Sequence, residues 1–379
     1  MGLSSLDLSV MQRDPYLFHL VCSSKQRRIN IDACDEEGFT VIHRLSADED
    51  RITRLGNVFS SAPFKGTREK VRQGLREIVE IVRELDGNFD LFTTTTKSKT
   101  QHSRPSDMLD QTPLMLAMRR VDVDVVKALL DNGANPNIEN EDGATAIHYL
   151  GSNTEEAKVQ CVQLLASHKA NLNHRSKSGA TLITRGGLSP GVVDALLSNG
   201  VSIEMVNSTT KAFENGQSLW MLLAAHDEPS PYVQDREVAK LLEKHVFRLQ
   251  DTEKIRKVID YADQDGFTML HKYVGRGMFF SVEALLQNGA QTNKMFCEKS
   301  HEWEGKVRVN FTRYLTPLDV AFKAAARREE DAKFSSEKYT RAQYDEYCER
   351  NNAIIKALEK FKGVRSAIPE VVSRVEFTK

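Results

Sequence analysis

The feature that most constrains the fold is a pair of distant segments with the same residue types at the same spacing. Counting from Thr112, Val126 stands at +14, two leucines at +17 and +18, Gly133 at +21 and Asn137 at +25. Counting from Thr268, the same residue types stand at the same offsets, at Val282, Leu285, Leu286, Gly289 and Asn293. Agreement at every marker over such a separation indicates a repeated structural unit.

Each repeat predicts two short helices joined by a turn. The hydroxyl of Thr112 can accept hydrogen bonds from the first-turn N–H groups, and Pro113 suits the first helical position. Val126, Leu129 and Leu130 form an apolar stripe on the second helix, which Gly133 ends. A single helix pair cannot bury its own apolar face, so we expect neighbouring repeats to stack.

The repeats resemble those of the ankyrin-repeat family. The resemblance lies in "TPLMLA" (112–117), "TAIHYL" (145–150), "TMLHKY" (268–273), "TPLDVA" (316–321) and "TVIHRL" (40–45), with weaker copies "TLITRG" (181–186) and "SLWMLL" (218–223). It implies an all-α solenoid of about seven helix-turn-helix units, joined by β-turn or hairpin connections. In this family the concave face of the stack commonly binds partners.

The repeats are irregular, and we predict three parts to the chain. Residues 1–29 form an N-terminal capping half-unit, residues 30–362 the repeat array, and residues 363–379 a C-terminal tail. Insertions interrupt the array near 47–70, 93–106, 226–232, 247–262 and 322–352. We expect a further short helix within 247–262 and solvated helix over much of 322–352.

Three histidines, His43, His148 and His271, each follow a helix-starting threonine by three residues. The resemblance implies a structural role for the pairs Thr40–His43, Thr145–His148 and Thr268–His271, in which the histidine links the turn to the threonine. The alternative is a metal site. The histidines belong to separate repeats and have no acidic or cysteine partner at ligand spacing, so we predict no metal and no other cofactor.

Composition and charge exclude several classes of partner. Lys+Arg 52 against Asp+Glu 53 gives a net charge of -1, and the bases form no patch, so no nucleic-acid partner is expected. No apolar stretch is long enough to cross a membrane, and the opening residues do not resemble a signal peptide. The five scattered cysteines favour reduced thiols. We therefore predict a cytoplasmic or nuclear protein that is not secreted, and a monomer.

Catalytic motifs are missing from the sequence: there is no P-loop, nucleophile elbow, H-E-x-x-H or kinase catalytic loop. The leading hypothesis is a non-enzymatic interaction module or scaffold that binds one or more proteins. A second hypothesis is a targeting or regulatory subunit of an enzyme complex. A third is an enzyme whose site lies in the inserted segments 47–70, 93–106 or 322–352.

Partner-binding positions follow from the resemblance. They comprise residues of the turns and residues on the exposed side of the first helices. The turn candidates are Glu36, Glu37, Phe39, Glu141, Asp142, Lys177, Ser178, Gln264, Asp265 and Phe267, and the helix candidates are Arg119, Arg120 and Arg276. Phe39 and Phe267 are predicted to be exposed aromatic anchors. The alternative is that each ring packs on its neighbouring turn.

Overall fold

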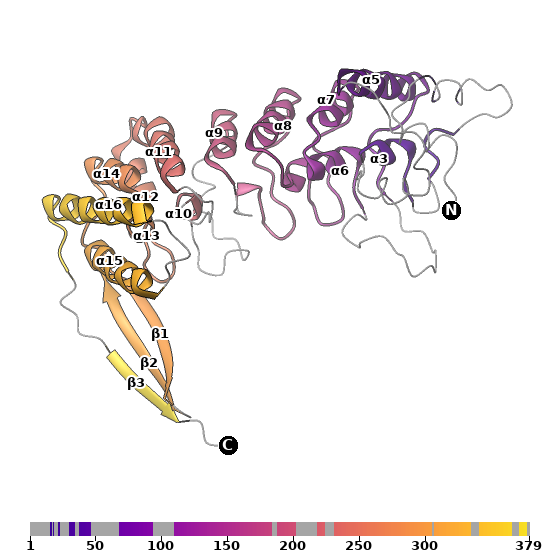
Figure 1. Ribbon diagram of the computed structural model, residues 1–379. Coiled ribbons are helices and arrows are strands. Elements are labelled where there is room, and N and C mark those ends of the chain that lie inside the picture. Colours follow the sequence, from indigo (N-terminus) through magenta and orange to yellow (C-terminus); the bar gives the residue numbers. More distant parts are fainter. Residues whose placement is uncertain are drawn as a thin grey trace. The chain divides into compact units, whose positions relative to one another are not determined.

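The computed structural model describes residues 16, 18, 22, 30–34, 38–46, 68–93, 110–183, 188–201, 218–223, 231–304, 307–334, 341–365 and 371–376 (Figure 1). The chain divides into two compact units. Unit 1 comprises residues 1–182 with 198–201, and unit 2 comprises residues 183–197 with 202–379.

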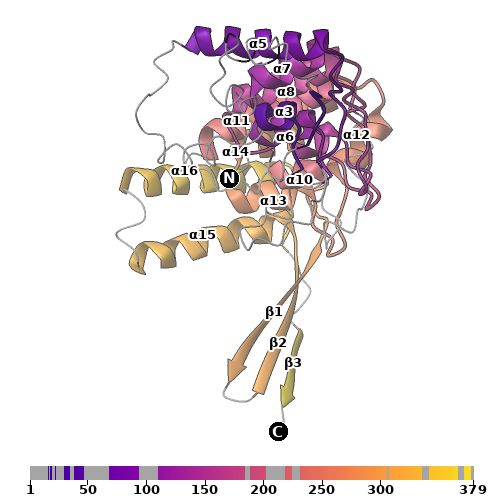
Figure 2. The same cartoon turned by 90° about the vertical axis from the view of Figure 1, so that its right-hand side faces the viewer.

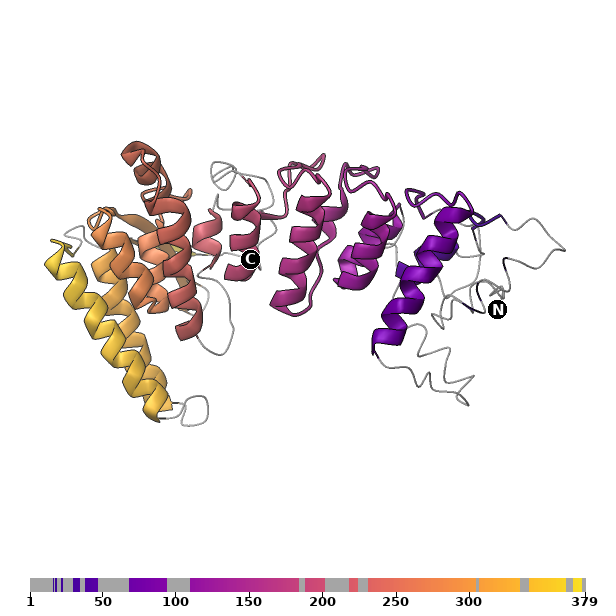
Figure 3. The same cartoon turned by 90° about the horizontal axis from the view of Figure 1, so that it is seen from above.

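Unit 1 consists of two rows of stacked helices. The first-helix row is α3 (Val41–Ser46), α6 (Pro113–Arg120) and the 3₁₀ helix η2 (Ala146–Tyr149). The second-helix row is α5 (Arg68–Glu84), α7 (Val123–Asp131) and α8 (Glu155–Ser167). In the first-helix row, α6 contacts α3 and η2. In the second-helix row, α7 contacts α5 and α8. Figure 3 shows the second-helix row from above, in indigo to magenta.

The core of unit 1 lies between these rows. Val126, Leu129 and Leu130 of α7 are all buried, as the predicted apolar stripe requires. On α5 the residues Leu75, Ile78, Val79 and Val82 recur at helical spacing and are equally buried, so α5 covers α7 with one apolar face.

Unit 2 repeats the same arrangement of two rows. The first-helix row is α10 (Leu219–Leu223), α13 (Met269–Arg276) and α15 (Pro317–Phe334). The second-helix row is α11 (Pro231–Leu242), α14 (Phe279–Gln287) and α16 (Arg341–Lys360). Successive members of each row are in contact. Unit 2 also holds α9 (Pro190–Ser198) apart from its last residue, a π-helical turn η5 (Glu243–Phe247) and α12 (Thr252–Ile259).

Two buried polar contacts tie neighbouring repeats of unit 2 together. The hydroxyl of Tyr273 donates to the carbonyl of Trp220 at 2.8 Å, and both residues are fully buried. The carboxylate of Asp235 on α11 accepts the N–H groups of Phe280 and Ser281, both at 2.9 Å, at the start of α14. Because these N–H groups have no partner within their own helix, α11 supplies the cap for α14.

A three-stranded antiparallel sheet projects from the helices of unit 2, as Figures 1 and 2 both show. Its strands are β1 (Phe296–Glu304), β2 (Val307–Leu315) and β3 (Val371–Glu376), in the order β1-β2-β3. β1 and β2 form a hairpin with Phe296 paired to Leu315 and Glu304 paired to Val307. The all-α prediction is therefore wrong for these segments, and the predicted tail contains a strand.

Several predicted segments can be compared with the structure. The segment 247–262 contains α12, and α15 and α16 account for the described part of 322–352. Gly133 and Gly289 have φ of 98° and 83° at the ends of α7 and α14, as predicted for helix-ending glycines. Most of the half-unit 1–29, of the insertions near 47–70 and 226–232, and all but Thr93 of 93–106 lie outside the described residues.

Candidate partner-binding surface

Each regular repeat begins with a five-residue turn directly before its helix-starting threonine; we call this segment the turn tip. Residues 140–144 form one turn tip, in which the N–H of Asn140 donates to the carbonyl of Ala144 at 3.0 Å. The same bond closes 176–180 at 2.9 Å and 263–267 at 2.9 Å. The fourth residue of each is a glycine with positive φ, for example Gly143 at 67°, a conformation that other residues adopt at a cost.

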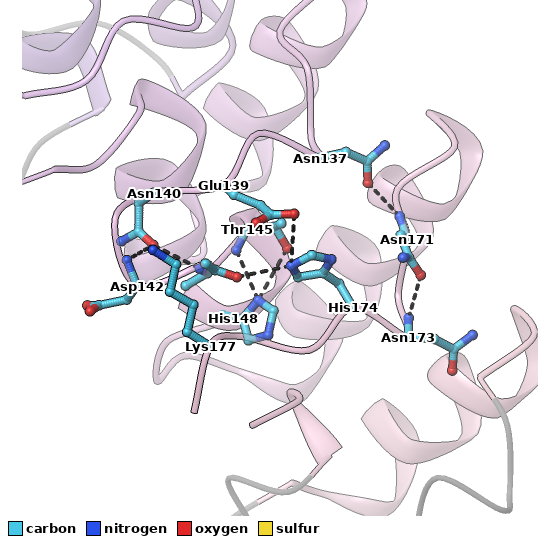
Figure 4. A network of polar contacts seen from close by, with 12 residues as sticks. Asn137, Glu139, Asn140, Asp142, Thr145, His148, Asn171, Asn173, His174 and Lys177 are labelled. Atoms are coloured by element: carbon cyan, nitrogen blue, oxygen red, sulfur yellow. Dashed lines mark hydrogen bonds and ion pairs between the residues drawn. The ribbon is translucent and has the colours of Figure 1, made fainter. Parts of the chain in front are cut away.

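The first side chain of each turn tip reinforces the turn. The side-chain oxygen of Asn140 accepts the N–H groups of Asp142 at 3.1 Å and Ala144 at 2.8 Å (Figure 4). The Asp263 carboxylate makes the corresponding bonds to the N–H groups of Asp265 and Phe267. These bonds satisfy backbone groups locally, so the turn conformation does not depend on a partner.

Neighbouring turn tips in unit 1 are joined through their backbones. The N–H of Lys177 donates to the carbonyl of Asp142 at 2.9 Å, and its ammonium group donates to the carbonyl of Glu141 at 2.7 Å. The N–H of Glu141 in turn donates to the Asp110 carboxylate. The backbone at Glu141 and Asp142 is thus bound by Lys177 of the following turn tip and by Asp110 of the preceding repeat.

A second set of contacts joins Asn and Asp side chains to backbone groups of the next repeat, beside the turn tips; we call it the Asx ladder. The side chain of Asn137 accepts the N–H of Asn171 at 2.7 Å and donates to the carbonyl of Lys169 at 3.1 Å (Figure 4). Asp90 accepts the N–H of Asn135 at 2.9 Å in the same way. The Asx ladder fixes the spacing of successive repeats, because each of its hydrogen bonds joins one repeat to the next.

Two of the three histidines, His43 and His148, also join a repeat to its neighbour. The Nδ1 of His148 accepts the N–H of Thr145 at 3.1 Å, so its Nε2 carries the proton that is directed to the carbonyl of Ala180 at 3.1 Å. His43 accepts from Thr40 at 3.1 Å and lies 2.9 Å from the carbonyl of Leu91. Both ring nitrogens of these histidines are therefore engaged with protein groups.

His271 repeats the bond to its threonine, with Nδ1 accepting the N–H of Thr268 at 3.1 Å. Burial lowers the pKa of His271 to about 4, against the opposing effect of the backbone groups of Lys294 and Leu315. Its ring is therefore neutral at pH 7. Within the described residues, no three His, Cys, Asp or Glu side chains are placed to hold a metal ion together.

Four of the predicted partner-binding residues lie exposed on two consecutive turn tips of unit 1: Glu141, Asp142, Lys177 and Ser178. Arg119 and Arg120, at the end of α6, are half-buried. In unit 2, Gln264 and Arg276 are exposed, and Asp265 and Phe267 are half-buried. Glu36 and Glu37 lie outside the described residues.

Tyr149 and Asp110 belong to this surface, although the sequence analysis does not predict them. The Tyr149 hydroxyl accepts a hydrogen bond from the side chain of Asn140 at 2.9 Å. Its pKa is raised by burial first and then by the charges of Asp142 and Asp110, with Arg119 acting in the opposite direction. The charges of two acids and one base therefore act on the hydroxyl of a half-buried tyrosine. Tyr149 directly follows His148 in the sequence, and this position in the first helix of the repeat could have identified Tyr149 as a candidate surface residue.

The prediction that Phe39 is an exposed anchor is wrong. Its side chain is 2% exposed, packs edge-on against His43 and is covered by Arg44, whose guanidinium lies 4.6 Å from the ring centre. Phe267 is half-buried, with its ring centre 3.6 Å from that of Phe296. An apolar ring directly before the threonine gains more from this packing than from exposure to water. The alternative, that the ring packs on its neighbouring turn, is supported for Phe267 by its contact with Phe296, whereas the contacts of Phe39 given above are with α3 of its own repeat.

Two longer connections stand where a regular repeat has its turn tip: Thr93–Gln111, which contains the predicted insertion 93–106, and the β1–β2 hairpin, which was not predicted as an insertion. The N–H of Thr93 donates to the carbonyl of Gln111, directly before Thr112, at 2.9 Å, and Phe296 pairs with Leu315, directly before Thr316. These two pairs replace the Asn140–Ala144 pair of a regular turn tip. Longer sequences therefore enter the chain at one equivalent position.

Among the described residues, no helix combines the length and the apolar character needed to cross a membrane. All five cysteines are free, and Cys161 is buried on α8.

Comparisons with known proteins address the repeats directly. A family model for ankyrin repeats matches residues 77–176 in three copies. The comparison with curated proteins found no match. Among solved structures, a chain of the complex of the Bd0816 predatory endopeptidase from Bdellovibrio bacteriovorus with the immunity protein Bd3460 is 21% identical, with a TM-score of 0.38. The match covers 65% of this chain and 96% of that one, and a TM-score this low supports no conclusion about function.

The predicted array of about seven units over 30–362 extends beyond the matched residues. Within them, the model covers most of α5 and all of α6, α7, η2 and α8, whose turn tips, Asx ladder and histidines are described above. Residues 77–176 of the chain are therefore ankyrin repeats.

Proposed function

We propose that the chain is a non-enzymatic interaction module that binds a partner protein through its turn tips and the exposed sides of its first helices. The observation that carries the proposal is the pair of consecutive turn tips in unit 1. They expose Glu141, Asp142, Lys177 and Ser178 on a backbone that hydrogen bonds hold in place. Ankyrin repeats are in general protein-binding modules, which supports this reading.

A held backbone favours binding for a physical reason. A loop that is already ordered loses little conformational entropy when it meets a partner, so more of the contact energy contributes to affinity. The charges of Glu141, Asp142 and Lys177 can select a partner of complementary pattern and speed its association. Tyr149, whose hydroxyl accepts a hydrogen bond from Asn140 of the first turn tip, offers a half-buried aromatic group at the same surface.

The proposal includes a cytoplasmic or nuclear location, because the five cysteines are free and reducing compartments keep thiols in that state.

The proposal is tested with a charge reversal at the turn tip, Glu141→Lys/Asp142→Lys. The matched control is Glu80→Lys/Glu84→Lys, which makes the same charge change at exposed positions on α5. All three proteins are first shown to have equal circular dichroism and thermal unfolding. Each is then used to capture proteins from a cell extract, with quantification by mass spectrometry.

We expect a specific set of proteins to be captured by the wild type and by the control, and to be depleted at least tenfold with the turn-tip variant. If the turn-tip variant captures the same set as the wild type, this surface is not the binding site. If the wild type captures nothing above background, the interaction module itself is disproved under those conditions.

A further inference from the structure

Lys272, on α13 of unit 2, holds a positive charge at a partly buried position. It stands four residues after Thr268, as Tyr149 stands four residues after Thr145. Its side chain is half-buried, and its ammonium group lies 4.7 Å from the centre of the Phe267 ring. The cation therefore rests on the face of an aromatic ring that belongs to the turn tip 263–267.

The ammonium group of Lys272 has no acceptor for its hydrogen bonds. Among the described residues, no hydrogen bond or ion pair engages it. Burial lowers the pKa of Lys272, the charges of Asp263 and Asp265 oppose this effect, and the charge of Arg276 adds to it. A half-buried ammonium group without an acceptor is costly, because its three donors have lost part of their water without a replacement.

The two acids near Lys272 do not serve as its direct partners. Asp263 is 7% exposed, and its carboxylate accepts the N–H groups of Asp265 at 3.1 Å and Phe267 at 2.8 Å. Asp265 is half-buried, and neither carboxylate forms an ion pair with Lys272. The charge of Lys272 is attracted by both acids but is not neutralised by contact, so it remains open to an anion from outside.

Exposed groups around the same turn tip indicate the kind of ligand that fits. Arg276 is exposed and stands four residues after Lys272, which places both bases on one face of α13. Met295 is 41% exposed, and its carbonyl oxygen lies 3.0 Å from the place that a Cβ on Gly266 would occupy. Two bases and an exposed apolar side chain thus border one turn tip, and a segment with both acidic and apolar side chains complements them.

We propose that Lys272 binds a carboxylate of a partner protein, carried by an Asp or Glu side chain of an acidic segment, with Arg276 as the second positive group. The carboxylate accepts from the ammonium group of Lys272, and an apolar neighbour in the segment packs on Met295. The pair supplies the acceptor that the half-buried ammonium lacks, in a place where charges are screened less than in water. This surface belongs to unit 2, and the proposal does not depend on the turn tips of unit 1.

A carboxylate suits this position better than a phosphate group. A lysine offers a single point charge rather than a planar fork of donors. Asp263 and Asp265 place two negative charges nearby, as their effect on the pKa of Lys272 shows. A phosphate group carries a charge of about −1.5 to −2 at pH 7, so these acids repel it more strongly than they repel a carboxylate.

The test uses a synthetic nine-residue peptide, GELELELEG, labelled with a fluorophore, and its binding to the full chain is followed by fluorescence anisotropy. A second peptide carries glutamine in place of every glutamate, and a third carries phosphoserine there. On the protein, Lys272→Met removes the charge but keeps a long side chain on Phe267. The matched control is Lys356→Met, which makes the same change at an exposed position of α16.

We expect saturable binding of the glutamate peptide to the wild type and to Lys356→Met, and at least tenfold weaker binding to Lys272→Met. An equal loss in both variants would show that only the net charge matters, and would overturn the proposal. Absence of binding to the wild type, equal binding of the glutamine peptide, or tighter binding of the phosphoserine peptide would overturn it as well.

Two further variants separate the charge of Lys272 from the folding of α13. In the repeat that starts at Thr40, Arg44 takes the same position and lies 4.6 Å from the centre of the Phe39 ring, so an arginine fits this arrangement. We therefore expect Lys272→Arg to bind the glutamate peptide within threefold of the wild type. Asp265→Asn removes a repelling charge and should strengthen binding at least twofold. A tenfold loss in Lys272→Arg, or weaker binding in Asp265→Asn, would contradict the proposal.

The position of the bound peptide is tested by ¹³C NMR of the lysine side chains, with the signal of Lys272 assigned from Lys272→Met. A carboxylate beside an ammonium group favours its charged form and so raises its pKa. We expect the titration of Lys272 to move to higher pH when the glutamate peptide is bound. An unchanged titration of Lys272 in the saturated complex would place the peptide elsewhere and overturn the proposal.

Discussion

The residue three positions after the helix-starting threonine has one task in the repeats that start at Thr40, Thr112, Thr145, Thr268 and Thr316. It accepts the backbone N–H of that threonine, which no other group in the first turn of the helix can satisfy. His148 does so with Nδ1, Met115 with its sulfur at 3.4 Å from the N–H nitrogen of Thr112, and Asp319 with a carboxylate oxygen at 3.0 Å from that of Thr316. The position therefore requires an acceptor rather than an imidazole.

Because methionine can replace histidine as the acceptor at this position, the effect of protonating His271 can be predicted and tested. The folded protein keeps the ring neutral down to about pH 4, whereas in the unfolded chain it gains a proton below about pH 6.5. The free energy of unfolding should therefore be unaffected by this group above pH 6.5. It should fall by about 1.4 kcal/mol per pH unit below pH 6.5, and by about 3 kcal/mol in total at pH 4.

The measurement is urea unfolding of the wild type and of His271→Met between pH 4 and pH 8. Methionine keeps an acceptor, as Met115 does, but cannot be protonated. Subtracting the two curves removes the contribution of all other titrating groups. A difference that stays constant over the whole pH range would show that His271 does not titrate in this window.

At this scale the sequence was informative where the interaction is local. The threonine and the acceptor three residues later are close in sequence, so their spacing alone predicts the contact. The burial of Phe39 could not be predicted in this way, because it depends on the surrounding fold and on the covering side chain of Arg44.

At the scale of the element, the turn tip and the hairpin are alternative forms of one connection. Five residues suffice between Asn140 and Ala144, and twenty residues, Phe296 to Leu315, fill the same place before Thr316. Only Phe296 and Leu315 at the base of the hairpin occupy positions that a regular turn tip also has. The outer part of the hairpin is therefore not needed to position α15.

We accordingly expect the hairpin to be replaceable. Substituting residues 297–314 by Glu-Asp-Gly, the sequence of residues 141–143, recreates a five-residue turn between Phe296 and Leu315. The helical circular dichroism per molecule should be unchanged, and the free energy of unfolding in urea should change by no more than about 1 kcal/mol. Loss of a cooperative unfolding transition would show that the sheet supports the helices.

Only half of the hairpin could have been recognised from the sequence. Val307, Val309 and Phe311 alternate with polar residues after Gly305-Lys306, which is typical of a strand that follows a turn. Residues 296–304 show no such alternation, because the only apolar residues among them are Phe296, Cys297 and Trp303. β3 is different: it pairs with a strand about 60 residues earlier in the chain, and no local pattern indicates such a partner.

At the scale of the whole molecule, each unit is built from helices that contact mainly their neighbours in the same row and their partners in the same repeat. In such a stack the stability is close to a sum of repeat and nearest-neighbour contributions. The period of the repeat was sufficient to predict the two helices of a repeat. The division into two units was not predictable, because it depends on how many contacts each repeat makes in three dimensions.

A core substitution in unit 1 should therefore act locally. Leu129→Ala removes a fully buried side chain of α7 and should lower the stability of unit 1 by about 2–5 kcal/mol. Hydrogen exchange followed by mass spectrometry should show faster exchange in α5, α7 and α8 and unchanged exchange in α13 and α14. Lys127→Ala, at an exposed position of α7, serves as the control. An equal loss of protection in both units would contradict the nearest-neighbour description.

The common position of the Thr93–Gln111 connection and the β1–β2 hairpin has a practical consequence for protein engineering. Because segments of very different length start and end at the same pair of backbone positions, a foreign peptide can be grafted between Asn140 and Ala144 with its ends held by the native hydrogen bond. The helix that follows keeps its own start at Thr145, independently of the graft. The chain thus offers defined sites at which an epitope, a reporter or a randomised library could be displayed on a folded support.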